Sequence, residues 1–352
     1  MHRMKYAVLL PFLACFAGCG DYSNMILQED LEFLYAVPAK STLEIRVAEQ
    51  ENREVELFRA EGSLSSQSSA VLGETATFYL LTLAFSIDVN KNVFGFLDLA
   101  DLIVSFPPTA REKDTRLWGP WPSADSPNTD WRFVMQRDRE SGLYDFTLQV
   151  NSVAKRNTPA YTEGWQHCLY GSMDPTEDSF RRGTGNLTAD VETCGQYEDS
   201  GEQGTASIGF DTSPDEDNPE GKTHLSIQFA DFVSKDMYEE NPDPQPINAL
   251  YSYEENGDYS GVFDFDAWTD LDAGENPDHE AREHVVIKTQ WDSSGAGRAD
   301  SVWSDGDLGA LELQIHECWD AEKKRVYYSD SHDLNPSEGD PGDCALLPAS
   351  FD

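Results

Sequence analysis

The segment of residues 292–300, Asp-Ser-Ser-Gly-Ala-Gly-Arg-Ala-Asp, places oxygen-bearing side chains at a spacing that suits calcium. A calcium loop has oxygen ligands at its first, third and fifth positions and a glycine at its sixth. Asp292 and Ser294 supply the first and third ligands, and Asp300 adds a carboxylate. Ala296 offers no side-chain oxygen at the fifth position, so a glycine-rich hairpin turn fits the segment better. Calcium bound by Asp292, Ser294 and Asp300 is therefore a secondary hypothesis, and calcium is the one cofactor that we consider.

Three other segments imitate functional motifs, but their spacing or context argues against each. Residues 152–155 form an S-x-x-K pattern at the end of a predicted strand, whereas the serine of such enzymes must open a helix. Residues 221–223 lack the upstream glycine of a phosphate-binding loop. His279 and His284 are five residues apart, which points them in different directions on a helix or a strand. We predict no catalytic residue and interpret the chain as non-enzymatic, although one sequence cannot display a site assembled from distant residues.

Charge excludes one class of partner. The 352 residues include 65 Asp and Glu but 25 Lys and Arg, which gives a formal net charge of −40 at pH 7. Contact with nucleic acid would bring like charges together, so nucleic-acid binding is excluded. The charge is compatible with cations or basic proteins as partners, or with a strongly hydrated surface alone.

The amino terminus has the pattern of an export signal. Two basic residues precede a short apolar stretch at 6–14, and residues 16–19 read Phe-Ala-Gly-Cys. This small-small-Cys ending resembles the lipobox of bacterial lipoproteins with a type II signal peptide. The resemblance implies that residues 1–18 are removed and that Cys19 is lipidated and becomes the first residue of the mature chain.

That resemblance also implies a location. The protein would be attached to a membrane of the bacterial cell envelope through its amino-terminal lipid. Gly20, rather than an acidic residue, follows Cys19 directly, which by the sorting rule of such lipoproteins favours the outer over the inner membrane. We predict a lipidated tether and linker at residues 19–40 and a single domain at residues 41–352.

Four cysteines remain once Cys15 leaves with the signal and Cys19 carries lipid. They are Cys168, Cys194, Cys318 and Cys344. An even number in an oxidising compartment predicts disulfides, and three pairings are possible. We favour the two pairs that are local in sequence, each of which would stabilise the fold by about 3.5 kcal/mol in the loop-closure model.

Two hydrophobic periods predict a mainly β fold with a helix. Residues 75–106 have apolar side chains three or four apart, which predicts one long or two consecutive helices ending before Pro107. Segments such as 144–150, 225–229 and 311–315 instead alternate strictly between apolar and polar residues. We predict an antiparallel meander or barrel-like sheet of about ten to twelve strands, with the amino-terminal helical segment packed on it.

Function can be predicted only from this architecture and location. Two further short strands are expected at 43–47 and 55–58, and eight tryptophans could line a cavity as well as fill a core. We expect a lipid-anchored protein that binds or carries an apolar small ligand in its β fold. The alternative is a structural or adhesion lipoprotein whose acidic loops bind cations or basic partners. Residues 291–318 resemble uncharacterised predicted bacterial lipoproteins, which adds no activity.

Overall fold

A computed structural model describes residues 26–47, 71–124, 126–176, 181–198, 201–214, 222–233, 245–269 and 281–351. The α-helices are α1 (Gln28–Tyr35), α2 (Lys40–Leu43), α4 (Thr77–Val104), α5 (Pro159–Glu163) and α6 (Val191–Glu198). The strands are β1 (Ala110–Arg111), β2 (Thr115–Pro122), β3 (Thr129–Arg137), β4 (Tyr144–Ser152), β5 (Gln166–Pro175), β6 (Gly183–Asp190), β7 (Gln203–Asp211), β8 (Thr223–Val233), β9 (Ile247–Glu255), β10 (Gly261–Thr269), β11 (Glu283–Trp291), β12 (Gly297–Asp305), β13 (Gly309–Trp319), β14 (Arg325–Asp330) and β15 (Glu338–Gly339). Short 3-10 helices lie at Val153–Lys155, Gly306–Leu308 and Pro341–Asp343.

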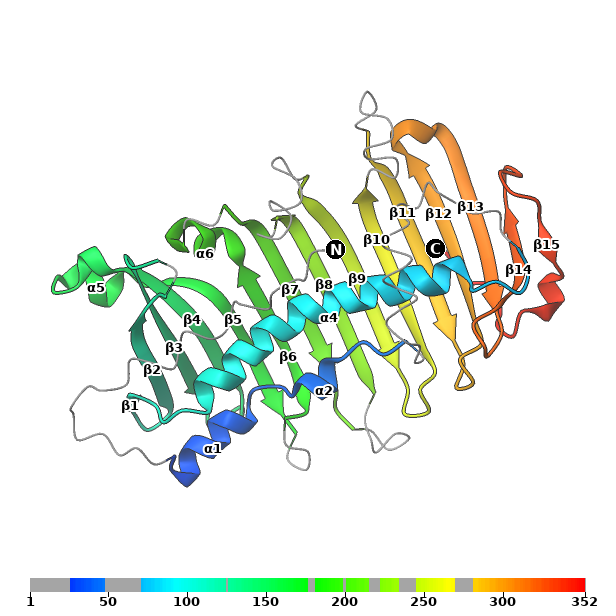
Figure 1. The fold of residues 1–352 in the computed structure, drawn as a ribbon. Helices are drawn as coiled ribbons and strands as arrows, with labels where there is room; N and C mark the ends of the chain where they lie inside the picture. The colour runs from blue at the N-terminus through cyan, green and yellow to red at the C-terminus, as the bar shows by residue number, and fades with distance from the viewer. Residues whose placement is uncertain are drawn as a thin grey trace, which may run out of the picture.

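All fifteen strands form one antiparallel sheet in which each strand pairs with its neighbours in sequence (Figure 1). The predicted mainly antiparallel meander is confirmed, and the sheet is open rather than closed into a barrel. The structure has more strands than the ten to twelve expected. The two edge strands are two residues long, and the buried apolar side chains of glycine-rich β6 are only those of Leu187 and Ala189.

One face of the sheet is apolar because alternate residues of every long strand point to it. Side chains opposite each other on successive strands form continuous rows across the sheet. The middle row consists of Met135, Phe146, Gly171, Leu187, Ile208, Ile227, Tyr251, Phe265, Ile287, Ser301 and Ile315. Most of these side chains are buried, so the rows form the core of the protein.

Helix α4 covers this apolar face. It runs diagonally across the strands, from β13 at its amino end towards β3 (Figure 1). Apolar side chains of the helix, which recur three or four residues apart, are buried against the sheet. The predicted helical segment is confirmed as one continuous helix of 28 residues. Ser105 caps its carboxyl end, and two prolines follow at 107 and 108. Among the described residues, none of the helices has the length and apolar character needed to span a membrane.

The folded part begins earlier than predicted. Helix α1 lies within the expected tether, yet Phe33 is fully buried and Asp30 is hydrogen-bonded to Arg111 and Arg116 on the sheet. The strand expected at 43–47 was wrong, because Leu43 ends helix α2 and the next residues join no strand. The strand expected at 55–58 lies outside the described residues.

Candidate functional site

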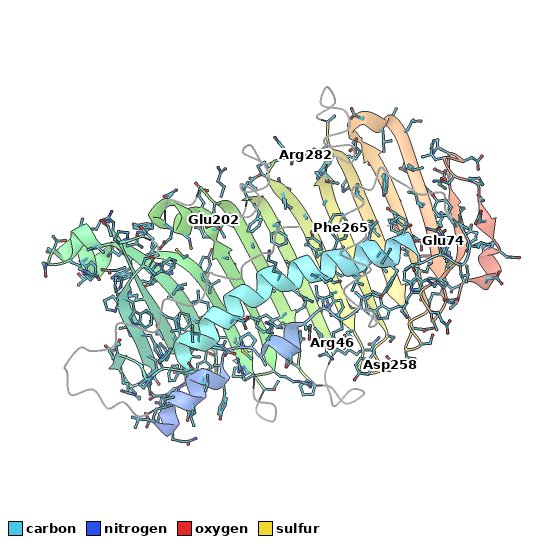
Figure 2. All side chains as sticks on the ribbon, in the orientation of Figure 1. Arg46, Glu74, Glu202, Asp258, Phe265 and Arg282 are labelled. Atoms are coloured by element: carbon cyan, nitrogen blue, oxygen red, sulfur yellow. A yellow bond between two sulfur atoms is a disulfide. The ribbon has the colours of Figure 1, made fainter. Side chains whose placement is uncertain are left out.

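A small pocket of about 70 Å³ lies at one end of the central strands of the sheet, which is called the sheet edge below. In an antiparallel meander every second connection is at the same edge, so the start of β6, the end of β7, the start of β8 and the β9–β10 turn meet there. Residues of α2 and of the segment that follows it also line the pocket, and Figure 2 shows Arg46 next to α2. The lining residues are Ser41, Thr42, Arg46, Arg182, Thr212, Lys222, Thr223, Glu255, Gly257 and Tyr259.

Helix α4 and β9 fix the segment that carries Arg46. The side-chain amide of Asn90 receives a hydrogen bond from the backbone N–H of Ile45 and donates one to its carbonyl, each at 2.9 Å. The backbone N–H of Arg46 donates to the Tyr253 hydroxyl, also at 2.9 Å. Both backbone groups of Ile45 are thus paired, as the satisfaction of buried polar groups requires.

Glu255 is the acidic member of the pocket. Its side chain is 10% exposed, accepts a hydrogen bond from the Tyr253 hydroxyl and lies 3.8 Å from the Arg46 guanidinium. Burial raises the pKa of Glu255 even though the Tyr253 hydrogen bond and Arg46 act in the opposite direction. Burial, followed by the charge of Glu255, also raises the pKa of Tyr253. The phenol therefore stays protonated and keeps donating to the carboxylate.

The predicted metal ligands do not all meet. Asp292 and Ser294 lie in the β11–β12 turn, where the Ser294 N–H and hydroxyl both donate to the Asp292 carboxylate. Asp300 lies three residues into β12, about 10 Å further along an extended strand. Within the described residues no three His, Cys, Asp or Glu side chains are grouped to hold a metal ion. The geometry joins two of the three residues, and calcium binding here stays a prediction.

Asp300 instead forms structural hydrogen bonds on the outer face of the sheet, which is the face away from α4. Its buried carboxylate accepts hydrogen bonds from the Arg298 guanidinium at 2.8 Å, from His316 Nδ1 at 2.6 Å and from the Ala349 N–H at 2.8 Å. Burial alone would raise the pKa of Asp300, but these hydrogen bonds outweigh it and lower the pKa from 3.8 to about 2. The carboxylate thereby holds the carboxyl-terminal tail on the sheet.

We expect replacement of Asp300 by asparagine to remove an acid-sensitive part of the stability. Because the folded pKa is depressed, the contribution of Asp300 is present above about pH 4 and is lost as the pH falls towards 2. The variant should lose roughly 2 kcal/mol of unfolding free energy at pH 7, and the difference from the unchanged protein should shrink below pH 3. Urea denaturation at pH 7, 4 and 2.5 measures this. An unchanged difference at all three values contradicts the assignment.

The structure places the four predicted disulfide cysteines in two local pairs. Cys318 and Cys344 form a disulfide, which confirms that pairing and fastens the tail to β13. Cys168 and Cys194 are free thiols in the structure. The two thiols are hydrogen-bonded to each other, and this contact, together with burial, raises the pKa of the Cys194 thiol. Helix α6 packs against β5, which carries Cys168 near its start, and the second disulfide stays a prediction.

Other predicted residues lie apart from the pocket or outside the described chain. His284 is on the outer face, where its ring pairs with Asp266 at 2.7 Å and stacks on Trp268. Its partner in the rejected metal motif, His279, lies outside the described residues, as does Cys19. Most residues of the acidic loops at 211–221, 236–246 and 270–283 also lie outside them. The pocket itself was not predicted, because its residues come from five separate parts of the sequence.

Comparison with protein-family models, with curated proteins and with solved structures gave no match for this chain.

Proposed function

We propose that the chain is a non-enzymatic, lipid-anchored protein of the bacterial cell envelope that binds a long apolar chain between the second half of α4 and the sheet. The observation that carries this proposal is the set of apolar rows that continues across the sheet beneath a single apolar helix. An apolar ligand needs such a surface together with a cover that keeps water away from it.

The two halves of α4 are attached differently. The first half has buried polar contacts, such as the hydrogen bond between the hydroxyls of Thr82 and Thr289 at 3.0 Å. The second half has ion pairs from Asp98 and Asp101, whose side chains are 52% and 36% exposed. Exposed pairs contribute at most about 1 kcal/mol. The second half is therefore the part of the helix that can separate from the sheet.

The energy of that separation sets the ligand's length. Among the side chains of the second half that the structure describes, those of Leu97, Ala100, Ile103 and Val104 are buried. Exposing the three larger of these costs about 5–9 kcal/mol. Each methylene that covers the sheet instead returns about 0.8 kcal/mol. A ligand of about ten or more methylenes can offset the separation, whereas a short chain cannot.

Fatty acids of increasing length test the proposal. A chain beginning at residue 20, exported so that its disulfide forms, is titrated with six-carbon to eighteen-carbon acids against a hydrophobic fluorescent probe. We expect no binding below about twelve carbons, the length that supplies ten methylenes, and a three- to fourfold gain in affinity per methylene above that length. Native mass spectrometry of the purified protein should show a co-purifying lipid.

Two variants separate opening of the helix from general effects of charge. Asp101→Asn removes an ion pair of the second half and should speed uptake of the probe severalfold. Asp266→Asn removes a half-exposed carboxylate of the outer face, which is bonded to His284, and should leave uptake unchanged. Failure of every acid to displace the probe, with no co-purifying lipid, would reject apolar-ligand binding.

The outer face favours the alternative, a structural or adhesion role. Its middle row is mostly polar and consists of Asp145, Ser172, Asn186, Gly209, Ser226, Ser252, Asp264, Lys288, Asp300 and His316. A broad polar sheet face can bind a partner through many hydrogen bonds without a cavity. This role is the second candidate if the fatty-acid titration fails.

A further inference from the structure

The pocket at the sheet edge reverses the charge balance of the chain. Among the described residues that line it, Arg46, Arg182 and Lys222 are cationic and Glu255 alone is acidic. The whole chain has 65 acidic and 25 basic residues, so a random set of ten would hold more acidic than basic ones. Clustered cations in a protein of this charge create a local positive potential that attracts anions.

Arg182 provides a second, independent observation. It directly precedes β6 and is half-buried. Within the described part of the chain, the structure gives its guanidinium neither a hydrogen bond nor an ion pair, although it lines the pocket. A guanidinium has five N–H donors in a planar fork that matches the oxygens of a phosphate or carboxylate. A half-buried one lacking a protein partner therefore indicates a ligand.

The hydroxyl groups limit what the ligand can be. Those of Thr42, Thr212 and Thr223 already donate to backbone carbonyls, at 2.7, 3.2 and 3.4 Å. Among the described residues the Ser41 hydroxyl makes no such bond, so it remains as a hydrogen-bond donor in the pocket lining. The Arg182 guanidinium and the Ser41 hydroxyl are thus both hydrogen-bond donors, and a ligand that meets them must supply acceptor oxygens in a small volume.

We infer that this pocket binds a small oxyanion of the phosphate class, with Arg182 as the principal contact and Arg46 and Lys222 as the neighbouring cations. The anion could be free phosphate or the phosphate of a lipid head group, because both present the same oxygens. Arg46 is shared between the anion and Glu255. The carboxylate of Glu255 opposes anion binding and sets how tightly the pocket holds its ligand.

Titration with inorganic phosphate at constant ionic strength tests the inference. The purified protein is studied by calorimetry as the unchanged chain and as Arg182→Gln, Glu255→Gln and Arg139→Gln. We expect saturable binding that is at least tenfold weaker in Arg182→Gln. Glu255→Gln should bind phosphate about three- to tenfold more tightly, because it removes the opposing charge and keeps an acceptor for Tyr253. Arg139 is an exposed arginine elsewhere on the molecule, and its variant should bind as the unchanged chain does.

A second titration separates the two sources of the anion. Vesicles of phosphatidylcholine with phosphatidic acid compete with phosphate if the pocket takes a head group, whereas they have no effect if it takes the free ion. Absence of saturable binding to the unchanged chain overturns the inference. Equal weakening in Arg182→Gln and Arg139→Gln also overturns it, because the effect would then be one of total charge. Either failure leaves the fatty-acid result unaffected, since the apolar face is a different surface.

Discussion

Replacement of Cys19 by serine is expected to abolish incorporation of radiolabelled palmitate and to leave residues 1–18 attached to the chain. The proposed anchor is a lipid on the Cys19 sulfur, and a serine hydroxyl cannot take the place of the thiol in that reaction. Removal of the signal follows lipidation in lipoproteins of this kind, so a longer precursor should accumulate. The measurements are autoradiography, intact mass and separation of membrane fractions.

Cys15 provides a matched control, since it is another cysteine in the same amino-terminal segment. Its replacement by serine should leave labelling, mass and fractionation unchanged, because it would leave with the signal. Labelling that persists in the Cys19 variant but disappears in the Cys15 variant would move the lipidation site. Labelling that is absent from the unchanged chain would remove the envelope anchor from the proposed function.

The fold was predictable where one period dominated a segment. Strict alternation in 225–229 and 311–315 placed β8 and β13, since one face of each strand is buried and the other polar. The helical period of 75–106 is interrupted in the sequence by the polar residues Asp88, Asn90 and Lys91, but α4 continues through them as one helix. Part of the reason is Asn90, which satisfies the backbone of Ile45 rather than ending the helix.

Tertiary contacts decided the parts that the sequence misassigned. The tether was predicted to reach residue 40 because residues after Cys19 are short and polar. In the structure Asp30 is only 4% exposed, and it is stabilised by arginines more than 80 positions later. Local pattern cannot reveal such a partner. The same holds for strand β6, whose glycines fit beneath neighbouring side chains such as Phe210.

The candidate site was hidden for a related reason. The spacing of Asp292, Ser294 and Asp300 is local and suggested a metal site, yet the strand carries Asp300 away from the turn to Arg298 and His316. Arg182 and Lys222 are 40 positions apart and form no motif together, and the imitation of a phosphate-binding loop at residues 221–223 lacks its upstream glycine. The register of β6, β7 and β8 places them at one edge, so only the three-dimensional arrangement shows the cluster.

The amino end of α4 depends on a buried ion pair. Glu317 on β13 is fully buried and accepts hydrogen bonds from the backbone N–H groups of Thr77 at 3.0 Å and Phe78 at 2.6 Å. These are two of the donors that a helix leaves unpaired at its first turn. Arg325 on β14 is bonded to the same carboxylate and, at 2.7 Å, to the Thr77 hydroxyl. One carboxylate thus joins the helix to both strands.

Replacement of Arg325 by methionine should lower the free energy of unfolding by about 3–5 kcal/mol at pH 7, as measured by urea denaturation. The apolar stem is retained, so packing changes little, but the Glu317 carboxylate stays buried without its cation. The double variant Glu317→Gln, Arg325→Met should recover part of this loss, because no uncompensated charge remains. The neutral glutamine side chain at position 317 can still accept a hydrogen bond from one of the two helix N–H groups.

An exposed arginine shows how much of the effect is due to burial. Arg139→Met breaks a pair with Asp114 in which the arginine is 52% exposed, and such pairs contribute less than about 1 kcal/mol. Equal losses in the Arg139 and Arg325 variants would mean that charge removal alone is responsible. A double variant less stable than Arg325→Met would mean that Glu317 stabilises the helix end without its arginine. Recovery in the double variant, with a small loss for Arg139→Met, would instead identify the desolvated charge as the cause.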